Sequence, residues 1–192
     1  RVAAALQRGA EIETRDDHER TALLLAATYD RVDVARVLVA HGADPDALDD
    51  RHDTPWLVTG VTGSVAMADV LLPANPDLTI RNRFGGVSVI PASHRGHVDY
   101  VRRVVETGID LDHVNDPGWT ALLEAVILGD GSERYQQIVK ILLDAGAGGV
   151  EEEVIATVTA NATSAERNVP VDSPHWFAIT AGSASPDEIG ER

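Results

Sequence analysis

The 192-residue chain contains no cysteine, which excludes a disulfide framework, a thiolate zinc site and a cysteine nucleophile. Aromatic residues make up only 4% of the chain while apolar residues make up 44%, so the core must be built from Ala, Val, Leu and Ile. No run of about 18 apolar residues occurs, which predicts that no helix crosses a membrane. Lysine is almost absent too, since Lys140 is the only one.

Acidic residues outnumber basic ones by 31 to 16, which gives a formal net charge of −15. Because such a field repels phosphate backbones and anionic lipids, we expect neither a nucleic acid nor a membrane surface as partner. The chain begins with Arg1 and not with Met, so we expect a trimmed start, which leaves open a removed signal peptide. We otherwise expect a cytoplasmic monomer.

A 33-residue period organises about three quarters of the chain. Helix-start positions recur at Thr21, Thr54, Val87 and Thr120, and chain-reversal positions recur at Gly9, Gly42, Asn75 and Gly108. We therefore predict a repeat domain over residues 1–148, with a partial leading repeat at 1–15 and full repeats at about 16–48, 49–81, 82–114 and 115–148.

Each period has room for two short helices and a turn. A threonine such as Thr54 can accept an orphan amide hydrogen at a helix start, and Pro55 suits the first helical position. In the second helix, Val34, Val37 and Leu38 follow helical apolar spacing, and Gly42 suits a C-terminal cap. The polar stretches between repeats indicate projecting turns.

These blocks resemble the ankyrin repeat, whose pattern is roughly Gly-x-Thr-Pro-Leu-His-x-Ala-Ala, then Val-x-x-Leu-Leu and Gly-Ala-Asp. Thr21-Ala22-Leu23-Leu24-Leu25-Ala26-Ala27 and Gly42-Ala43-Asp44 show the likeness in one repeat, and a narrower likeness is to bacterial ankyrin proteins. The resemblance implies an all-α ankyrin repeat solenoid of paired antiparallel helices with projecting β-turn loops. It also implies a concave groove that binds a protein partner.

Two departures from the family pattern carry structural predictions. The third repeat has Val87-Ser88 at its helix start and Pro91 inside the helix, so this helix should be kinked or start late. The fourth repeat carries five extra residues around 129–134, which predicts a longer loop between its two helices.

Carried over by register, the resemblance implies a set of partner-binding positions on the turns and inner helix faces. Phe84 and Trp119 stand out, since a large aromatic at a turn tip can be a binding hot spot, although packing onto neighbouring turns is the alternative. Trp56 follows Thr54-Pro55 and is expected in the core. The full predicted set is Asp17, His18, Arg20, Tyr29, Asp50, Arg51, Asp53, Arg83, Phe84, His94, Arg95, Asp116 and Trp119.

Acidic residues gather in the first two turns, at 16–19 and 49–53. One interpretation is a cation site or a metal-dependent hydrolase with His18 or His52 among the ligands. Another is a solvated loop edge, and a third is attraction of a partner with a basic patch. Because no metal-ligand spacing and no catalytic motif occurs, we expect no metal, no cofactor and no enzymatic activity.

Residues 149–192 break the period and form an acidic, aperiodic tail. A short helix from Glu151 to about Thr159 is expected, and the apolar cluster 175–179 is a candidate for docking on the last repeat. A disordered tail and a partial cap therefore both stay open. The chain could also be a regulatory piece of a larger multidomain protein.

Overall fold

The computed structural model describes Ala4 and residues 8–148. Within this part the chain folds into four helix pairs: α2 (Ala22–Thr28) with α3 (Val32–Ala40), α4 (Pro55–Thr62) with α5 (Val65–Leu71), α6 (Val89–His94) with α7 (Val98–Val104), and α8 (Ala121–Ile127) with α9 (Glu133–Asp144). Short 3₁₀ turns extend α5 (η1, Leu72–Ala74) and α7 (η2, Val105–Thr107). The prediction of an all-α repeat solenoid is confirmed.

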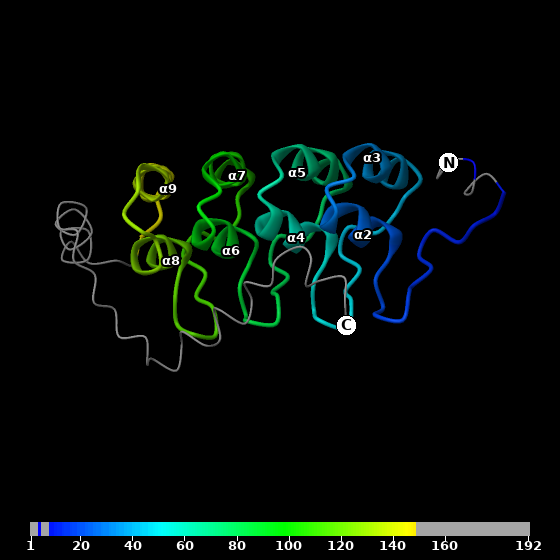
Figure 1. Ribbon diagram of the computed structural model, residues 1–192, viewed down its shortest axis with the longest axis horizontal. Coiled ribbons are helices and arrows are strands. Elements are labelled where there is room, and N and C mark those ends of the chain that lie inside the picture. Colours follow the sequence, from blue (N-terminus) through cyan, green and yellow to red (C-terminus); the bar gives the residue numbers. More distant parts are fainter. Residues whose placement is uncertain (1–3, 5–7, 149–192) are drawn as a thin grey trace.

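The pairs stack side by side along the long axis of the molecule (Figure 1). The first helices, α2, α4, α6 and α8, make one row, and the second helices, α3, α5, α7 and α9, make a parallel row. The connecting turns project from the side of the first row. None of the helices within residues 8–148 has the length and apolarity needed to span a bilayer.

Three of the first helices begin at a threonine cap, as predicted. The hydroxyls of Thr21, Thr54 and Thr120 accept the amides of Leu24, Leu57 and Leu123 at 3.2, 3.1 and 3.3 Å. All three threonines are buried, so each bond also gives a buried hydroxyl group a hydrogen-bond partner.

The first helix of the third repeat starts one register position later than the others. It begins at Val89, because Val87 cannot supply a capping oxygen. Pro91 is then its third residue, where the missing amide hydrogen is one of those that a helix leaves unpaired. The expected late start is confirmed.

The core of the described residues is mostly aliphatic, and Trp56 and Tyr100 are the most deeply buried of its aromatic side chains. Trp56 is 1% exposed, which confirms its predicted place in the core, and Tyr100 is fully buried. Thr59 donates to the Trp56 carbonyl oxygen at 2.6 Å, so the Tyr100 hydroxyl donates to Thr59 Oγ1 at 2.7 Å. Burial raises the pKa of Tyr100 to about 12. This bond joins the second repeat to the third.

The five extra residues of the fourth repeat do not all enter its loop. The linker between α8 and α9 covers 128–132, against 29–31 in the first repeat, and α9 has 12 residues where α3 has nine. Glu133 and Arg134, which we assigned to the loop, instead form the first turn of α9. The longer loop is therefore confirmed, since the linker gains two residues, but the other three extra residues lengthen α9.

Candidate partner-binding surface

The four turns share one hydrogen-bond pattern, built on an Asp or Asn at the first position. The Oδ1 atom of this residue accepts the backbone amide four residues later, and its own amide donates to the carbonyl oxygen four residues later. In the first three turns Oδ1 also accepts the amide two residues later, whereas the fourth turn has Pro117 there, which has no amide hydrogen. These bonds are made by Asp16 (to His18, 3.0 Å, and Arg20, 2.9 Å), Asp49 (to Arg51, 2.9 Å, and Asp53, 2.8 Å), Asn82 (to Phe84 and Gly86, both 3.0 Å) and Asn115 (to Trp119, 2.8 Å).

The fourth position of every turn has a left-handed backbone. The φ angles are 59° at Glu19, 61° at His52, 72° at Gly85 and 89° at Gly118. Only glycine adopts this region without a steric penalty, so the first two turns carry a local strain that the last two avoid.

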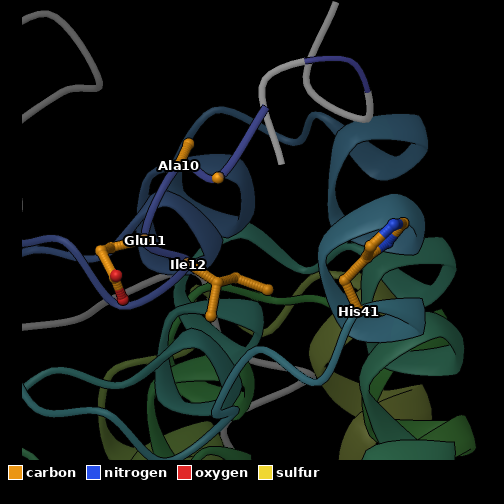
Figure 2. Close-up of a pocket in the computed structure, with 5 residues that line it drawn as sticks. Ala10, Glu11, Ile12 and His41 are labelled. Atoms are coloured by element: carbon orange, nitrogen blue, oxygen red, sulfur yellow. The ribbon is translucent and has the colours of Figure 1, made fainter. Parts of the chain in front are cut away.

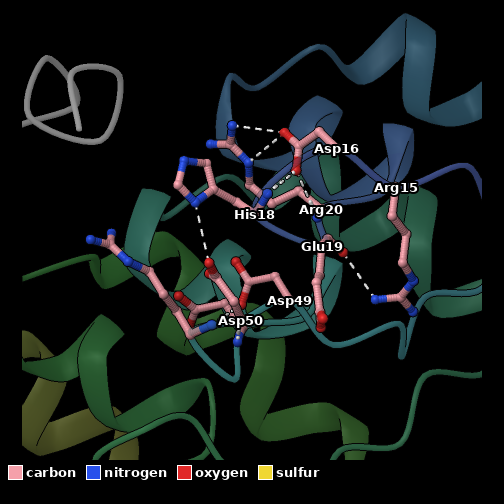
Figure 3. A network of polar contacts seen from close by, with 9 residues as sticks. Arg15, Asp16, His18, Glu19, Arg20, Asp49 and Asp50 are labelled. Carbon is pink, nitrogen blue, oxygen red and sulfur yellow. Dashed lines mark hydrogen bonds and ion pairs between the residues drawn. The ribbon is translucent and has the colours of Figure 1, made fainter.

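Polar contacts connect the first turn to the second (Figure 3). His18 Nδ1 lies 3.2 Å from Asp50 Oδ2, and the Asp50 amide donates to the His18 carbonyl oxygen at 3.2 Å. The guanidinium of Arg20 holds Asp16 at 2.8 Å and lowers the pKa of that carboxyl to about 2. The acidic turns thus stack directly against each other.

This arrangement bears on the cation-site hypothesis. One carboxylate in each acidic turn, Asp16 and Asp49, is occupied by turn amides. The part of the chain that the structure describes contains no group of three or more His, Asp or Glu side chains placed to hold a metal ion. The two turns are adjacent, as expected, and one acid of each serves the turn backbone.

The second and third turns meet through Asp53, Arg83 and Phe84. Arg83 Nη1 lies 3.6 Å from Asp53 Oδ2, and its guanidinium carbon lies 4.5 Å from the Phe84 ring centre. Burial, assisted by the nearby Asp49 carboxylate, raises the pKa of Asp53 to about 6 even though Arg83 acts to lower it. The half-buried Phe84 side chain therefore has a guanidinium group over its ring.

A buried carboxylate that the sequence analysis did not select lies beneath the third and fourth repeats. Glu124 is 5% exposed, and its Oε2 atom is 2.9 Å from His94 Nδ1 while Oε1 accepts Asn115 Nδ2 at 3.0 Å. The Tyr135 hydroxyl donates to the His94 carbonyl oxygen at 2.8 Å. A signal was available, because the equivalent positions of the earlier repeats hold Leu25, Val58 and Pro91.

The remaining predicted residues differ in exposure. Tyr29, the C-cap residue directly after α2, is 46% exposed, and Trp119 is half-buried in the fourth turn. Arg95 is half-buried, and burial together with the nearby Arg83 lowers its pKa. The exposed aspartates and arginines of the set are Asp17, Asp50, Arg51, Arg83 and Asp116. The structure therefore brings together His18 with Asp50 and Asp53 with Arg83 and Phe84, while Tyr29 and Trp119 belong to the first and fourth repeats.

Comparison with known proteins agrees with this architecture. The ankyrin repeat family model matches residues 18–50, and a second model, for ankyrin repeats in many copies, matches residues 91–143. Over 148 residues the chain is 36% identical to the ankyrin repeat protein YahD of Escherichia coli (strain K12), covering 77% of this chain and 74% of that one. The chain belongs to the ankyrin repeat family. Ankyrin repeats generally mediate protein–protein interactions and are generally not enzymes.

Solved ankyrin structures superpose on the chain as well. An ankyrin repeat domain from Acinetobacter baumannii AYE matches with a TM-score of 0.76 and 38% identity, covering 83% of this chain and 85% of that one. A second solved ankyrin repeat protein matches with a TM-score of 0.72 and 35% identity, covering 76% of this chain and 74% of the other.

Another set of acids, away from the turn tips, connects successive ankyrin repeats. The carboxylates of Glu13, Asp46 and Asp112 accept the backbone amides of Asp44 (2.9 Å), Asp77 (2.9 Å) and Gly148 (2.7 Å). Each bond joins the loop of one repeat to the loop of the next. Part of the negative charge therefore has a structural use, and it is not all available to a partner.

An open hollow of about 330 Å³ lies at the N-terminal end of the described ankyrin repeats (Figure 2). Gly9, Ala10, Glu11, Ile12 and His41 line it. His41 directly follows α3, and its Nδ1 atom is 2.8 Å from the Val37 carbonyl oxygen, so this side chain caps the helix. The hollow contains none of the predicted partner-binding residues.

Proposed function

We propose that this ankyrin domain is a non-enzymatic scaffold that binds a protein partner through the surface formed by its four turns and the row α2, α4, α6 and α8. The observation that carries the proposal is the presence of two half-buried aromatic residues, Phe84 and Trp119, on the third and fourth turns. Aromatic side chains at such positions contribute much contact area at a small cost in conformational entropy.

The preorganisation of Phe84 supports this role. Its ring is stacked against Arg83, Arg83 pairs with Asp53, and the Phe84 carbonyl oxygen accepts the Asp116 amide at 3.0 Å. A partner that contacts this ring would lose little entropy in ordering it, since the neighbouring turns already do so.

The charge of the first two turns favours a partner with a basic patch. Asp17 and Asp50 are exposed at equivalent turn positions, and the corresponding position of the third turn holds Arg83. The fourth turn again holds an exposed acid, Asp116, so one basic position interrupts a row of three acidic ones, and this pattern would orient a partner with complementary charges. We include a monomeric, cytoplasmic state in the proposal, which size-exclusion chromatography and cell fractionation test.

The proposal is tested by combining Phe84→Ala with Trp119→Ala in the full chain and measuring partner capture from a lysate of the source organism. We expect the double variant to melt close to the unmodified protein and to lose the captured partner. The matched control is Gln136→Ala with Gln137→Ala, which removes two exposed side chains from α9 in the other row of helices.

Two outcomes contradict the proposal. If the Phe84/Trp119 double variant unfolds, those rings stabilise the turns and are not available for binding. If it folds and captures the partner as well as the α9 control does, the partner binds elsewhere.

A further inference from the structure

The C-terminal face of the last described repeat is apolar and uncovered within residues 8–148. Burial at equivalent positions shows this directly. Leu24, Leu57 and Ile90 are 1%, 2% and 3% exposed, whereas their fourth-repeat equivalent, Leu123, is half-exposed. Earlier repeats therefore bury this position against the next repeat, and the fourth repeat has no described neighbour to do so.

Two further positions follow the same pattern. Ala27 and Ser93 are fully buried, whereas their equivalent Val126 is half-exposed. In the second helices, Ala35, Ala68 and Val101 are fully buried, whereas Val139 of α9 is half-exposed. We define Leu123, Val126 and Val139 as the C-terminal face.

We propose that residues 150–158 of this same chain cover the C-terminal face as an amphipathic capping helix. Repeat solenoids need a terminal unit that is apolar inside and polar outside. From residue 152 on, Val154, Ile155 and Val158 share one side of a helix, while Glu153 and Ala156 fall on the opposite side; Glu151 lies at the N-terminal end of the apolar side. The segment therefore has one side for the face and one for water.

The position of the segment in the chain favours it over other occupants. The Gly148 amide donates to Asp112 Oδ1 at 2.7 Å, so the described chain is attached to the solenoid up to that residue. Residue 150 follows after one more glycine, and such a short connection costs little loop-closure entropy. The later apolar cluster at 175–179 is apolar at almost every position, so it offers no polar outer side.

The first test compares Val154→Asp with Ala156→Asp in the full chain by amide hydrogen exchange. Val154→Asp places a charge on the inner side of the proposed helix, so we expect α8 and α9 amides to exchange about tenfold faster while α2 to α5 are unchanged. Ala156→Asp places the same charge on the outer side and should exchange like the unmodified chain. If the two variants exchange alike, the proposal is overturned.

A second measurement does not depend on a destabilised variant. Since the chain has no cysteine, Ala156→Cys can carry a single nitroxide label. We expect this label to broaden the methyl resonances of Leu123, Val126 and Val139 in dilute samples. If these resonances are not broadened, the proposal is overturned. It is also overturned if broadening occurs only between a labelled chain and an unlabelled chain in a mixed sample, because a second copy would then cover the face. A third outcome also overturns the proposal. If a label at Ser173→Cys broadens these resonances and the label at Ala156→Cys does not, residues 175–179 cover the face.

Discussion

The first two turns of this ankyrin domain have the same backbone as the last two but are built from different residues. The first pair starts with Asp16 and Asp49 and places Glu19 and His52 at the left-handed position. The second pair starts with Asn82 and Asn115 and places Gly85 and Gly118 there.

This difference shows what the turn requires. It needs a side-chain oxygen that accepts backbone amides, and either a carboxylate or an amide oxygen meets that need. It also needs a left-handed residue, which glycine accepts freely and other residues accept at a cost. The first residue of each turn is therefore charged in the acidic pair and neutral in the Asn-Gly pair, and only the acidic pair places a non-glycine residue in the left-handed region.

The largest expected effect on stability comes from replacing the first residue of the fourth turn, Asn115, by the aspartate that the first two turns have at this position. Asn115→Asp would set a carboxylate where an amide now donates to buried Glu124 at 3.0 Å. Two carboxylates at that distance repel each other, so we expect a loss of about 3 kcal/mol in the free energy of unfolding, measured with urea. The control is Asn82→Asp, because Pro91 stands at the position equivalent to Glu124. It should cost under about 1 kcal/mol, and equal losses would contradict the explanation.

The next largest effect on stability is expected from substituting the left-handed glycines of the third and fourth turns, Gly85 and Gly118. A Cβ at Gly85 would lie 2.2 Å from Asp116 Oδ1 and 3.0 Å from the Asp116 amide nitrogen, whereas one at Gly118 would meet nothing within 4 Å. Both substitutions to alanine strain the backbone by about 1 kcal/mol, and Gly85→Ala should lose about 1 kcal/mol more. Thermal unfolding of the two variants checks the difference. Equal melting temperatures would show that Asp116 moves aside without cost.

A smaller effect of opposite sign is expected in the first turn. Glu19→Gly removes the left-handed penalty, which outweighs the entropy that glycine adds to the unfolded chain, so the protein should gain about 0.5 kcal/mol. His52→Gly should behave in the same way in the second turn. Chemical denaturation measures both, and a loss of stability in either variant would show that the side chain contributes more than its strain costs.

The smallest effect is a local response to acid. Arg20 lowers the pKa of Asp16 to about 2 from its ordinary value of 3.8. A carboxyl with a lowered pKa stabilises the fold above its ordinary value and loses that contribution as the pH falls from about 4 to about 2. We expect a carbon NMR titration of Asp16 to have its midpoint near pH 2. A midpoint near 4 would mean that the Arg20 contact is not maintained in solution, and Asp16→Asn serves as the non-titrating control.

Local chemistry made some features predictable. The threonine caps were identified because an N-cap bond spans only three residues, and the late start of α6 followed from Val87 and Pro91 for the same reason. The extra residues of the fourth repeat were located correctly by counting. Their division between loop and helix was not, because it depends on how α9 packs.

Contacts between repeats were harder to predict. The 33-residue register placed Asp53, Arg83 and Phe84 on one surface. The spacing did not show that Arg83 would form an ion pair with Asp53 and stack on the Phe84 ring. Glu124 was missed because its burial depends on His94 and Asn115, which reach it from a different helix and from a turn. The partner-binding role of these residues remains a prediction.

The sequence by itself determined the 33-residue period, the helix starts and the aliphatic character of the core, since these depend on neighbours a few residues apart. The tertiary structure decided which charges serve the fold. Stacking at a fixed repeat brings residues about 30 positions apart into contact, so that Asp46 and Asp112 hold backbone amides and Glu124 becomes buried. The net charge of −15 is a property of the composition, but only the stacking separates the acids that support the solenoid from those that face water.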